Sequence, residues 1–153
     1  MRVERSTRSV GETEALGEAF GREVRPGDVL ALVGDLGSGK TAFVRGLARG
    51  MGSTDRVSSP TYTLMAEYGS GRLPLHHFDA YLAEKEMRFL RSGALEYFYG
   101  EGVAVVEWGD RIEADLPSDR LEIRLEIRGE EERLLRFRGS GARSEGLLGR
   151  VLR

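Results

Sequence analysis

Apolar residues at three different spacings divide the chain into the elements of an α/β fold. Val29–Val33 is apolar at every position, as expected of a strand buried on both faces of a sheet, and Val103–Val106 repeats the pattern. Over residues 10–24 and 42–51 apolar residues recur every three or four positions, which predicts amphipathic helices. From Leu121 to Ile127 apolar and charged residues alternate, which predicts a half-exposed strand.

Weaker patterns predict further strands over residues 2–7, 62–68, 73–79 and 133–138, and helical segments over 83–92 and 94–99. Ser9, followed three residues later by Glu12, is a capping box that would begin the first helix. Gly69-Ser70-Gly71 is typical of a hairpin turn, so the strands on either side of it are expected to be antiparallel. Near the C-terminus an apolar stripe would dock either on the body of the domain or on a partner; it consists of Leu147, Leu148, Val151 and Leu152.

The first apolar strand is followed by the segment Gly34-Asp35-Leu36-Gly37-Ser38-Gly39-Lys40-Thr41, which has the spacing G-x-x-x-x-G-K-[ST] of a phosphate-binding loop. The glycines allow backbone angles that other residues avoid, and they let the amides approach an anion closely. These amides and the N-terminus of the next helix form a nest for the β- and γ-phosphates. The alternative is a glycine-rich turn with no ligand. Strand, loop and helix in this order favour a nucleoside triphosphate site, to which all eight residues contribute.

Two side chains of the loop carry specific chemistry. Lys40 supplies a compact positive charge near the phosphate oxygens, and Thr41 offers a hydroxyl to Mg²⁺, which prefers oxygen ligands. Of the 23 basic residues in the chain, only Lys40 and Lys85 are lysines. Because Arg and Lys are not interchangeable in a tight loop, a lysine at this one position supports the assignment.

The order of elements around this loop predicts a single α/β domain over residues 1–153, with the three-layer fold of P-loop NTPases. Its sheet would be mixed, with a parallel core and antiparallel hairpins. The tail, about residues 139–153, is expected to be flexible or to dock on a partner.

Acidic residues end two of the predicted strands. Glu107 follows the second apolar run, where a Walker-B-type acid would hold Mg²⁺ or polarise water opposite the loop. Asp79 ends the strand 73–79 and would act on Mg²⁺ through water or orient the attacking water. Thr61, after a loop rich in Ser and Gly, is a candidate for sensing the γ-phosphate. Asp79, Glu107 and Lys40 are therefore the predicted catalytic residues, and Thr41 and Glu107 the predicted metal ligands. In the plain structural alternatives Glu107 meets solvent at the end of its strand and Thr61 begins a strand.

Other positions are open to more than one interpretation. Trp108, the only tryptophan, covers the nucleotide site or a partner surface, or it simply packs in the core. Thr13, with Thr7 and Ser9, would lie near the base or ribose, or these residues only cap and border the first helix. 

His76 and His77 are expected to point to opposite faces of their strand, and without a matching cluster they predict no metal site. Arg133, Arg136 and Arg138 are expected to pair across strands, with the alternative that one of them reaches toward phosphate.

Composition excludes several classes of function. The chain has no cysteine, which excludes disulfides, thiol catalysis and cysteine-ligated metals. Its formal net charge of -2 disfavours a protein that holds nucleic acid by a global positive field. The N-terminus lacks the apolar core of a signal peptide and no apolar run approaches membrane-spanning length, so we expect a cytoplasmic protein.

Taken together, the motifs resemble the TsaE family, small bacterial P-loop ATPases needed to make threonylcarbamoyladenosine in tRNA. The resemblance rests on the phosphate loop and on three later blocks, in this order: Ser59-Pro60-Thr61-Tyr62-Thr63-Leu64, His77-Phe78-Asp79-Ala80-Tyr81 and Val106-Glu107-Trp108. It covers roughly residues 9–110. The phosphate loop alone is shared by many unrelated enzymes, whereas the three blocks are far more specific.

The resemblance implies an ATPase that uses ATP and Mg²⁺ and has little activity alone. It implies that Lys40 binds phosphate and that Thr41 and Glu107 bind magnesium. It also implies that Asp79 serves hydrolysis. Thr61 would lie in a switch-like loop, and Trp108 on the nucleotide side of the site. The implied partners are TsaD- and TsaB-like subunits of a threonylcarbamoyl transferase complex, which would hold the tRNA. The chain itself would not transfer the group.

One departure from the family pattern concerns the residues after Asp79. The family usually continues His-x-Asp-Leu-Tyr-Arg-Leu, whereas Tyr81 is followed here by Leu82-Ala83. The function of that arginine is either absent or supplied by another residue such as Arg88.

Three other functions are weighed against partner-stimulated hydrolysis. A small-molecule kinase could use the same loop, but no lid segment with arginines is evident. A GTP-dependent switch would carry an Asn-Lys-x-Asp pattern, which the sequence lacks. A nucleotide-binding adaptor that never hydrolyses would not need Asp79 and Glu107.

Overall fold

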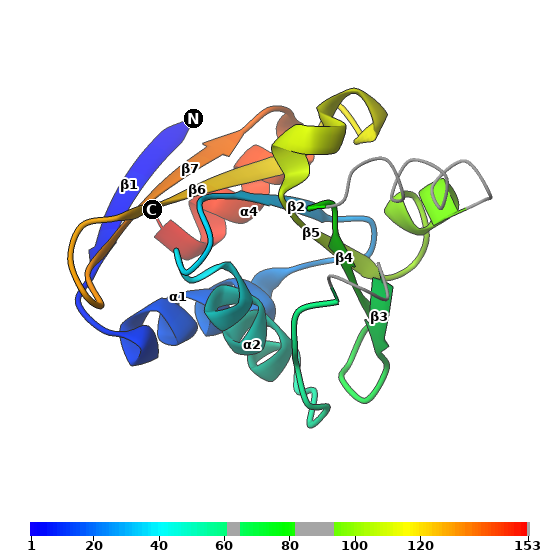
Figure 1. The fold of residues 1–153 in the computed structure, drawn as a ribbon. Helices are drawn as coiled ribbons and strands as arrows, with labels where there is room; N and C mark the ends of the chain where they lie inside the picture. Colours follow the sequence, from blue (N-terminus) through cyan, green and yellow to red (C-terminus); the bar gives the residue numbers. More distant parts are fainter. Residues whose placement is uncertain (61–64, 82–93, 153) are drawn as a thin grey trace.

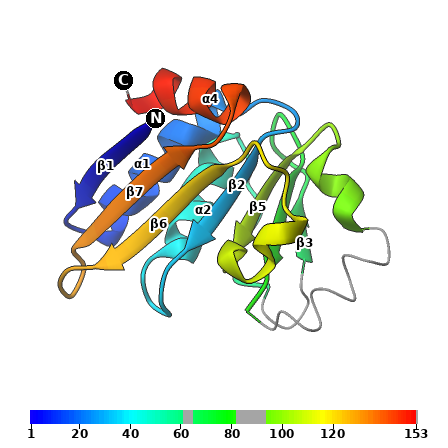
Figure 2. The ribbon, with the colours of Figure 1, turned by 90° about the horizontal axis from the view of Figure 1, so that it is seen from above.

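The computed structural model describes residues 1–60, 65–81 and 94–152 of the chain. Within them a seven-stranded sheet has the order β1-β7-β6-β2-β5-β4-β3 (Figures 1 and 2). The strands are β1 Arg2–Thr7, β2 Val29–Val33, β3 Met65–Tyr68, β4 Leu75–Asp79, β5 Val103–Glu107, β6 Leu121–Ile127 and β7 Arg133–Gly139. The α-helices are α1 Val10–Glu23, α2 Lys40–Gly50 and α4 Ala142–Leu152, and the 3₁₀ helices are η1 Ala94–Phe98 and η2 Gly109–Asp115.

The centre of the sheet is parallel and its margins are antiparallel. Strand β2 pairs in parallel with β5 and β6, and β5 pairs in parallel with β4. Antiparallel pairing joins β3 to β4, β7 to β6 and β1 to β7. The predicted α/β fold with a mixed sheet is therefore confirmed, and β2 lies in its middle.

Apolar side chains cover both faces of the sheet. One core lies between the sheet and α1, α2 and α4, and includes Phe20, Phe43 and Phe137, each at most 1% exposed. The other core lies on the face covered by η1 and η2, and includes Phe78, Phe98 and Ile112. Figure 1 shows the two sets of helices on opposite sides of the strands. This arrangement makes three layers and explains why β2 and the first four residues of β5 are all apolar.

Glycines let α1 and α2 approach each other closely. A methyl group at Gly46 of α2 would overlap the carbonyl oxygen of Glu14 in α1, and one at Gly50 would overlap that of Glu18. Gly17 and Gly21 of α1 meet α2 in the same way. The position of α2, which follows the phosphate loop, is thus fixed by backbone-to-backbone contact.

The ends of the chain follow the sequence patterns. Residues 2–7 form an edge strand as predicted, and the Ser9 hydroxyl accepts a hydrogen bond from the Glu12 amide at 3.1 Å. The predicted helix over 83–92 and the start of the predicted strand at 62 lie outside the described residues. The C-terminal stripe is on α4, where Leu147 and Leu148 are buried against the first core, so the stripe docks on the body of the domain. Figure 2 shows α4 beside α1.

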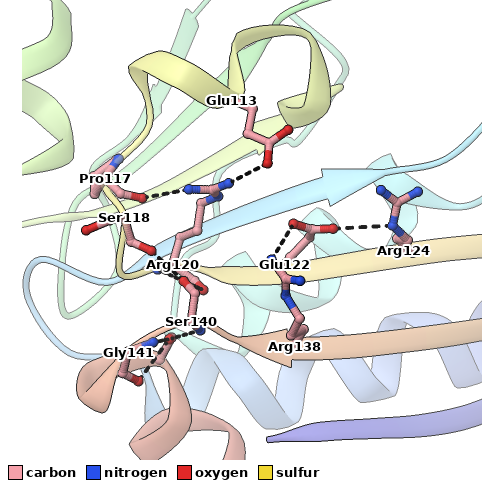
Figure 3. A network of polar contacts seen from close by, with 10 residues as sticks. Glu113, Pro117, Ser118, Arg120, Glu122, Arg124, Arg138, Ser140 and Gly141 are labelled. Carbon is pink, nitrogen blue, oxygen red and sulfur yellow. Dashed lines mark hydrogen bonds and ion pairs between the residues drawn. The ribbon is translucent and has the colours of Figure 1, made fainter.

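Charged residues pair across the exposed face of β6 and β7. Figure 3 shows Glu122 between Arg124, at 3.3 Å, and Arg138, at 3.9 Å. Arg136 contacts Glu4 at 2.8 Å and Glu126 at 3.1 Å. The predicted cross-strand pairing is therefore confirmed for Arg136 and Arg138.

Among the described residues, no helix combines the length and the apolar character that crossing a bilayer requires.

Candidate nucleotide site

The carboxyl ends of the central parallel strands bring the predicted site residues together. In the register of the sheet, Glu107 at the end of β5 lies opposite Leu32 of β2 and opposite Asp79 of β4. The phosphate loop leaves β2 one residue after Leu32 and ends at α2. Ligands of open α/β sheets bind at this edge, so the loop and both acids occupy the expected place.

The loop backbone takes a conformation that requires glycine. Gly37 and Gly39 have φ angles of 78° and 104°, in the left-handed region. Gly34 lies so near β6 that a methyl group there would come within 2.7 Å of the Leu125 carbonyl oxygen. The Ser38 side chain is 1% exposed and Leu36, at the outer side of the loop, is 69% exposed. Glycine is thus needed where the motif has it.

Lys40 begins α2 and turns back over the loop. Its ammonium donates hydrogen bonds to the carbonyl oxygens of Gly34 and Asp35, and lies 4.1 Å from the centre of the Trp108 ring. Burial lowers the pKa of Lys40, while the charges of Glu107, Asp79, Asp35 and Asp110 oppose the shift. A buried ammonium held mainly by neutral carbonyl oxygens can exchange them for the charged oxygens of an anion.

Thr41 and Glu107 place oxygen atoms side by side. The Thr41 hydroxyl donates to Glu107 with 3.2 Å to each carboxylate oxygen. Glu107 is 2% exposed. A hydroxyl beside a carboxylate fits Mg²⁺, a hard cation that takes one or two protein oxygens and completes its shell with water and phosphate. The described residues contain no group of three or more His, Cys, Asp or Glu that could hold a metal ion.

Asp79 is held at the same edge by two further hydrogen bonds. Its Oδ2 accepts from the Ser59 hydroxyl and its Oδ1 from the Tyr81 amide, both at 2.8 Å. It is 1% exposed. The carboxylate therefore has a fixed orientation beside Glu107.

Trp108 directly follows Glu107 in a strained conformation. Its φ of 60° is the only positive φ of a non-glycine residue in the described part of the chain, and such an angle is an outlier for a bulky side chain. The indole contacts Lys40, and its centroid lies 5.0 Å from that of Tyr81. Trp108 both lines the pocket beside the loop and packs against the second core, so its role in nucleotide binding stays a prediction.

An arginine that was not predicted as a site residue, Arg111, lies beside Tyr81. The Arg111 guanidinium lies 5.2 Å from the Trp108 ring and 5.1 Å from the Tyr81 ring, and donates to the Tyr81 carbonyl at 3.0 Å. The earlier candidate, Arg88, lies outside the described residues. Arg111 comes from η2, so only the fold brings it beside Tyr81.

A second arginine, Arg133, supports the phosphate loop, a role that was not predicted for it. Arg133, expected to pair across strands or to reach phosphate, donates to the Gly37 carbonyl at 2.9 Å and to the Ser38 carbonyl at 3.1 Å. Its remaining hydrogen bonds go to carbonyl oxygens of the β6–β7 turn, at Gly129, Glu130 and Glu132. Arg133 thus connects the turn to the phosphate loop.

The remaining predicted residues are placed as follows. Thr13 is 1% exposed, and its hydroxyl shares a hydrogen bond of 2.8 Å with that of Thr7. It lies beside Gly39 but does not line the pocket. Thr61 lies outside the described residues. The roles of both in nucleotide binding stay predictions.

These elements enclose an open pocket of about 590 Å³ beside the loop. It is lined on the loop side by Leu36, Gly37, Gly39, Lys40 and Thr41, and opposite by Ser59, Asp79, Tyr81, Glu107 and Trp108. Cationic and amide donors from one side face carboxylates from the other. Such a site suits a phosphate chain with a divalent cation between its oxygens and the acids.

Comparison with known proteins agrees with this geometry. The family model "Threonylcarbamoyl adenosine biosynthesis protein TsaE" matches residues 7–135. A protein of Bacillus subtilis (strain 168) named tRNA threonylcarbamoyladenosine biosynthesis protein TsaE is 47% identical over 136 residues, which are 89% of this chain and 85% of the relative. A protein of the same name from Treponema pallidum (strain Nichols) is 43% identical over 121 residues, 79% of this chain and 89% of the relative.

A solved structure extends the similarity to the whole fold. The crystal structure of YdiB from Bacillus subtilis superposes with a TM-score of 0.86 at 40% sequence identity. The superposition covers 99% of this chain and 94% of that one.

Proposed function

The chain belongs to the TsaE family of threonylcarbamoyl adenosine biosynthesis proteins, and we propose that it is a magnesium-dependent ATP hydrolase required for threonylcarbamoyl modification of adenosine 37 in tRNA. It acts on the partner transferase complex and does not transfer the group itself. The partners are TsaD- and TsaB-like subunits. The net charge of -2 supports a protein that meets tRNA only through them.

The observation that carries the proposal is the pair formed by Thr41 and Glu107 next to Lys40. The pair offers oxygen ligands for Mg²⁺, and the Lys40 ammonium would exchange the carbonyls of Gly34 and Asp35 for phosphate oxygens. The bound ion would withdraw charge from the phosphate oxygens as a Lewis acid. The loop amides at the start of α2 would hold the phosphates by hydrogen bonds.

Hydrolysis needs a group that holds the attacking water, and Asp79 is the candidate. It lies beside Glu107 in the register, is buried, and has both oxygens oriented by hydrogen bonds. A fixed carboxylate at this edge can accept a hydrogen bond from water that faces the γ-phosphate. Trp108 would shield the same region from solvent, and Thr61 would join it from its loop.

The deciding experiment measures release of inorganic phosphate from ATP, with and without the partner complex. We expect a low rate alone and a rise of tenfold or more with the partners. Glu107→Gln should lower the stimulated rate about a hundredfold, the range seen when one charge-stabilising group is removed. Glu101→Gln, an exposed acid before the opposite end of β5, is the matched control and should leave the rate unchanged.

The same assay tests the alternative functions. Phosphorylation of a small molecule in place of phosphate release would overturn the proposal in favour of a kinase. Equal rates with and without partners would remove the regulatory part. Preference for GTP over ATP would contradict the choice of nucleotide.

A further inference from the structure

A line of hydrogen-bonded side chains crosses the buried space between the sheet and α2. It starts at Glu107, whose Oε2 lies 2.6 Å from His77 Nε2. His77 Nδ1 lies 3.0 Å from the Tyr68 hydroxyl, which lies 3.2 Å from the Ser58 carbonyl oxygen. The exposed fractions are 2% for Glu107, 0% for His77 and 5% for Tyr68. The line leads from the proposed magnesium ligand to the loop before Thr61.

The neighbours of this line are apolar, so its polarity needs an explanation. On the same face, Leu75 lies two residues before His77, and Val103 and Val105 precede Glu107 in the same alternation. An apolar side chain at position 77 would pack among them without any hydrogen bond. Buried polar groups are costly unless every one of them is paired. Packing alone does not require the imidazole of His77 or the hydroxyl of Tyr68.

Two acceptors, one on each side of Tyr68, compete for the single hydrogen of its hydroxyl group. In a neutral imidazole one ring nitrogen donates and the other accepts, so with Nε2 donating to the Glu107 carboxylate, Nδ1 accepts. The Tyr68 hydroxyl has one hydrogen and two neighbouring acceptors, His77 Nδ1 and the Ser58 carbonyl. Movement of the Ser58 carbonyl therefore changes which of the two acceptors receives the Tyr68 hydrogen. This in turn changes the hydrogen bond that orients the His77 ring.

The next residue of the loop is tied to the other acid. The Ser59 hydroxyl donates to Asp79 at 2.8 Å. Consecutive residues thus contact both acids of the site, Ser58 through Tyr68 and His77, and Ser59 directly. A displacement of the backbone here alters the surroundings of both carboxylates together.

We propose that His77 and Tyr68 are positioning residues that couple the loop at Ser58 and Ser59 to the carboxylate of Glu107. His77 holds this carboxylate facing Thr41, and Tyr68 transmits the position of the Ser58 carbonyl to His77. Binding of magnesium and nucleotide at Glu107 changes how the loop is held, and movement of the loop changes how Glu107 is held. The inference rests on the proposed function, because it takes Glu107 as a ligand of the magnesium ion.

Tyr68→Phe is the sharpest variant, since it removes the hydroxyl and keeps the ring. Nucleotide affinity is followed by Trp108 fluorescence with ADP and ATP, with and without Mg²⁺, and the loop by hydrogen exchange of a peptide containing Ser58 and Ser59. In the wild type, Mg-ATP should change this exchange. In Tyr68→Phe the change should shrink about threefold or more, with unaltered protection of the phosphate loop. The kcat should fall about three- to tenfold, as for one lost hydrogen bond, with unchanged KM.

Two substitutions at position 77 separate positioning from packing. His77→Leu removes the donor to Glu107 and should abolish most of the tightening of ATP binding by Mg²⁺. His77→Gln places an amide donor near the position of Nε2 and should restore that tightening, but not the exchange response of the loop. A merely structural role would predict no such split between the two readouts.

His76→Phe is the matched control. His76 is the adjacent residue, is 7% exposed, and faces the other side of the sheet, where its ring lies 4.6 Å from that of Tyr97. It contacts neither acid in the described structure. All binding, exchange and kinetic values should match the wild type.

The outcomes distinguish this inference from the proposed function. If the wild type binds and hydrolyses Mg-ATP but Tyr68→Phe keeps the wild-type exchange response and kcat, the coupling is refuted and the function stands. If the wild type binds no Mg-nucleotide, both fail. Should His77→Leu not fold, Tyr68→Phe and His77→Gln still decide the question.

Discussion

The Arg133 guanidinium donates a hydrogen bond of 2.9 Å to the carbonyl oxygen of Gly37, across 96 positions of sequence. A second bond of 3.1 Å reaches Ser38. These carbonyls belong to the peptide units beside the left-handed Gly37 and Gly39, so Arg133 holds the most constrained part of the phosphate loop. The donors also neutralise carbonyl oxygens that would otherwise repel phosphate.

We expect Arg133→Ala to weaken ATP binding about tenfold, in line with one or two hydrogen bonds from a charged donor. The loop would keep its glycines but lose the contact that selects its conformation. Titration of Trp108 fluorescence with ATP measures the effect. Arg138→Ala is the control, because Arg138 lies on the same strand, pairs with Glu122 and lines neither of the cavities that Gly34 and Lys40 line. Equal losses in both variants would mean that general charge matters and not the contact with Gly37.

Register explains why sequence patterns predicted Arg136 and Arg138 correctly but not Arg133. Arg138 lies opposite Glu122, and Arg136 opposite Glu4, so opposite charges meet across the strands. Arg133 lies opposite Thr7 on one side and Ile127 on the other. With no acid facing it, its side chain is available to the loop. Alternation along β7 already places Arg133 on the face of Leu135 and Phe137, opposite to Arg136 and Arg138, but only the alignment of the three strands shows that no acid meets it there.

Local sequence was sufficient to predict the structure of the site where its residues lie in one short segment. The strand, phosphate loop and helix over residues 29–50 were predicted because each residue type has a local conformational cause. The alternation of His76 and His77 also follows from strand geometry alone, and they do face opposite sides. The positive φ of Trp108 and the approach of Arg111 could not be predicted, since both arise from packing of η2 on the sheet.

A second prediction concerns the contact of Lys40 with Trp108. The ammonium lies 4.1 Å from the ring centre, and Trp108 is the only tryptophan. Because nucleotide would draw the ammonium toward phosphate, ATP should change the Trp108 emission. Lys40→Met should lower ATP affinity by a hundredfold or more, about 3 kcal/mol for a charged group with several donors. Lys40→Arg should not restore binding, because the larger guanidinium does not fit a loop built for a compact charge.

A third prediction tests whether the close approach of α1 and α2 positions the site. Gly46→Ala places a methyl group against the Glu14 carbonyl, and α2 must shift. We expect a loss of about 3 kcal/mol in the free energy of unfolding, at the upper end for overpacking, together with weaker ATP binding. Chemical denaturation and nucleotide titration measure the two effects. Gly11→Ala, where the methyl group would make only an ordinary contact of 3.7 Å with the Ser9 hydroxyl oxygen, should instead stabilise by about 0.5–1 kcal/mol. Wild-type stability of Gly46→Ala would refute the contact.

The last prediction concerns the start of α4, where Asp119 caps the helix from another segment. Its Oδ2 accepts from the Arg143 amide at 2.9 Å, and its Oδ1 from the Ser144 amide at 3.1 Å and hydroxyl at 2.6 Å. Burial raises the pKa of Asp119, but the hydrogen bonds from Ser144 and Arg143 and the Arg143 charge together outweigh it. The pKa therefore lies below its ordinary value. A lowered pKa means that the folded protein prefers the carboxylate, so the cap stabilises the fold at neutral pH.

Asp119→Asn should lower the free energy of unfolding at pH 7 by about 1 kcal/mol, as for the loss of a helix cap. The difference from the wild type should stay constant down to about pH 5, since both folded and unfolded chains carry the carboxylate there. Below about pH 4 it should shrink, because the unfolded carboxyl is protonated first and the folded one follows at lower pH. Denaturation at several pH values, with Asp115→Asn as control, measures this. A difference that grows as the pH falls would contradict a lowered pKa and assign Asp119 a role other than capping α4.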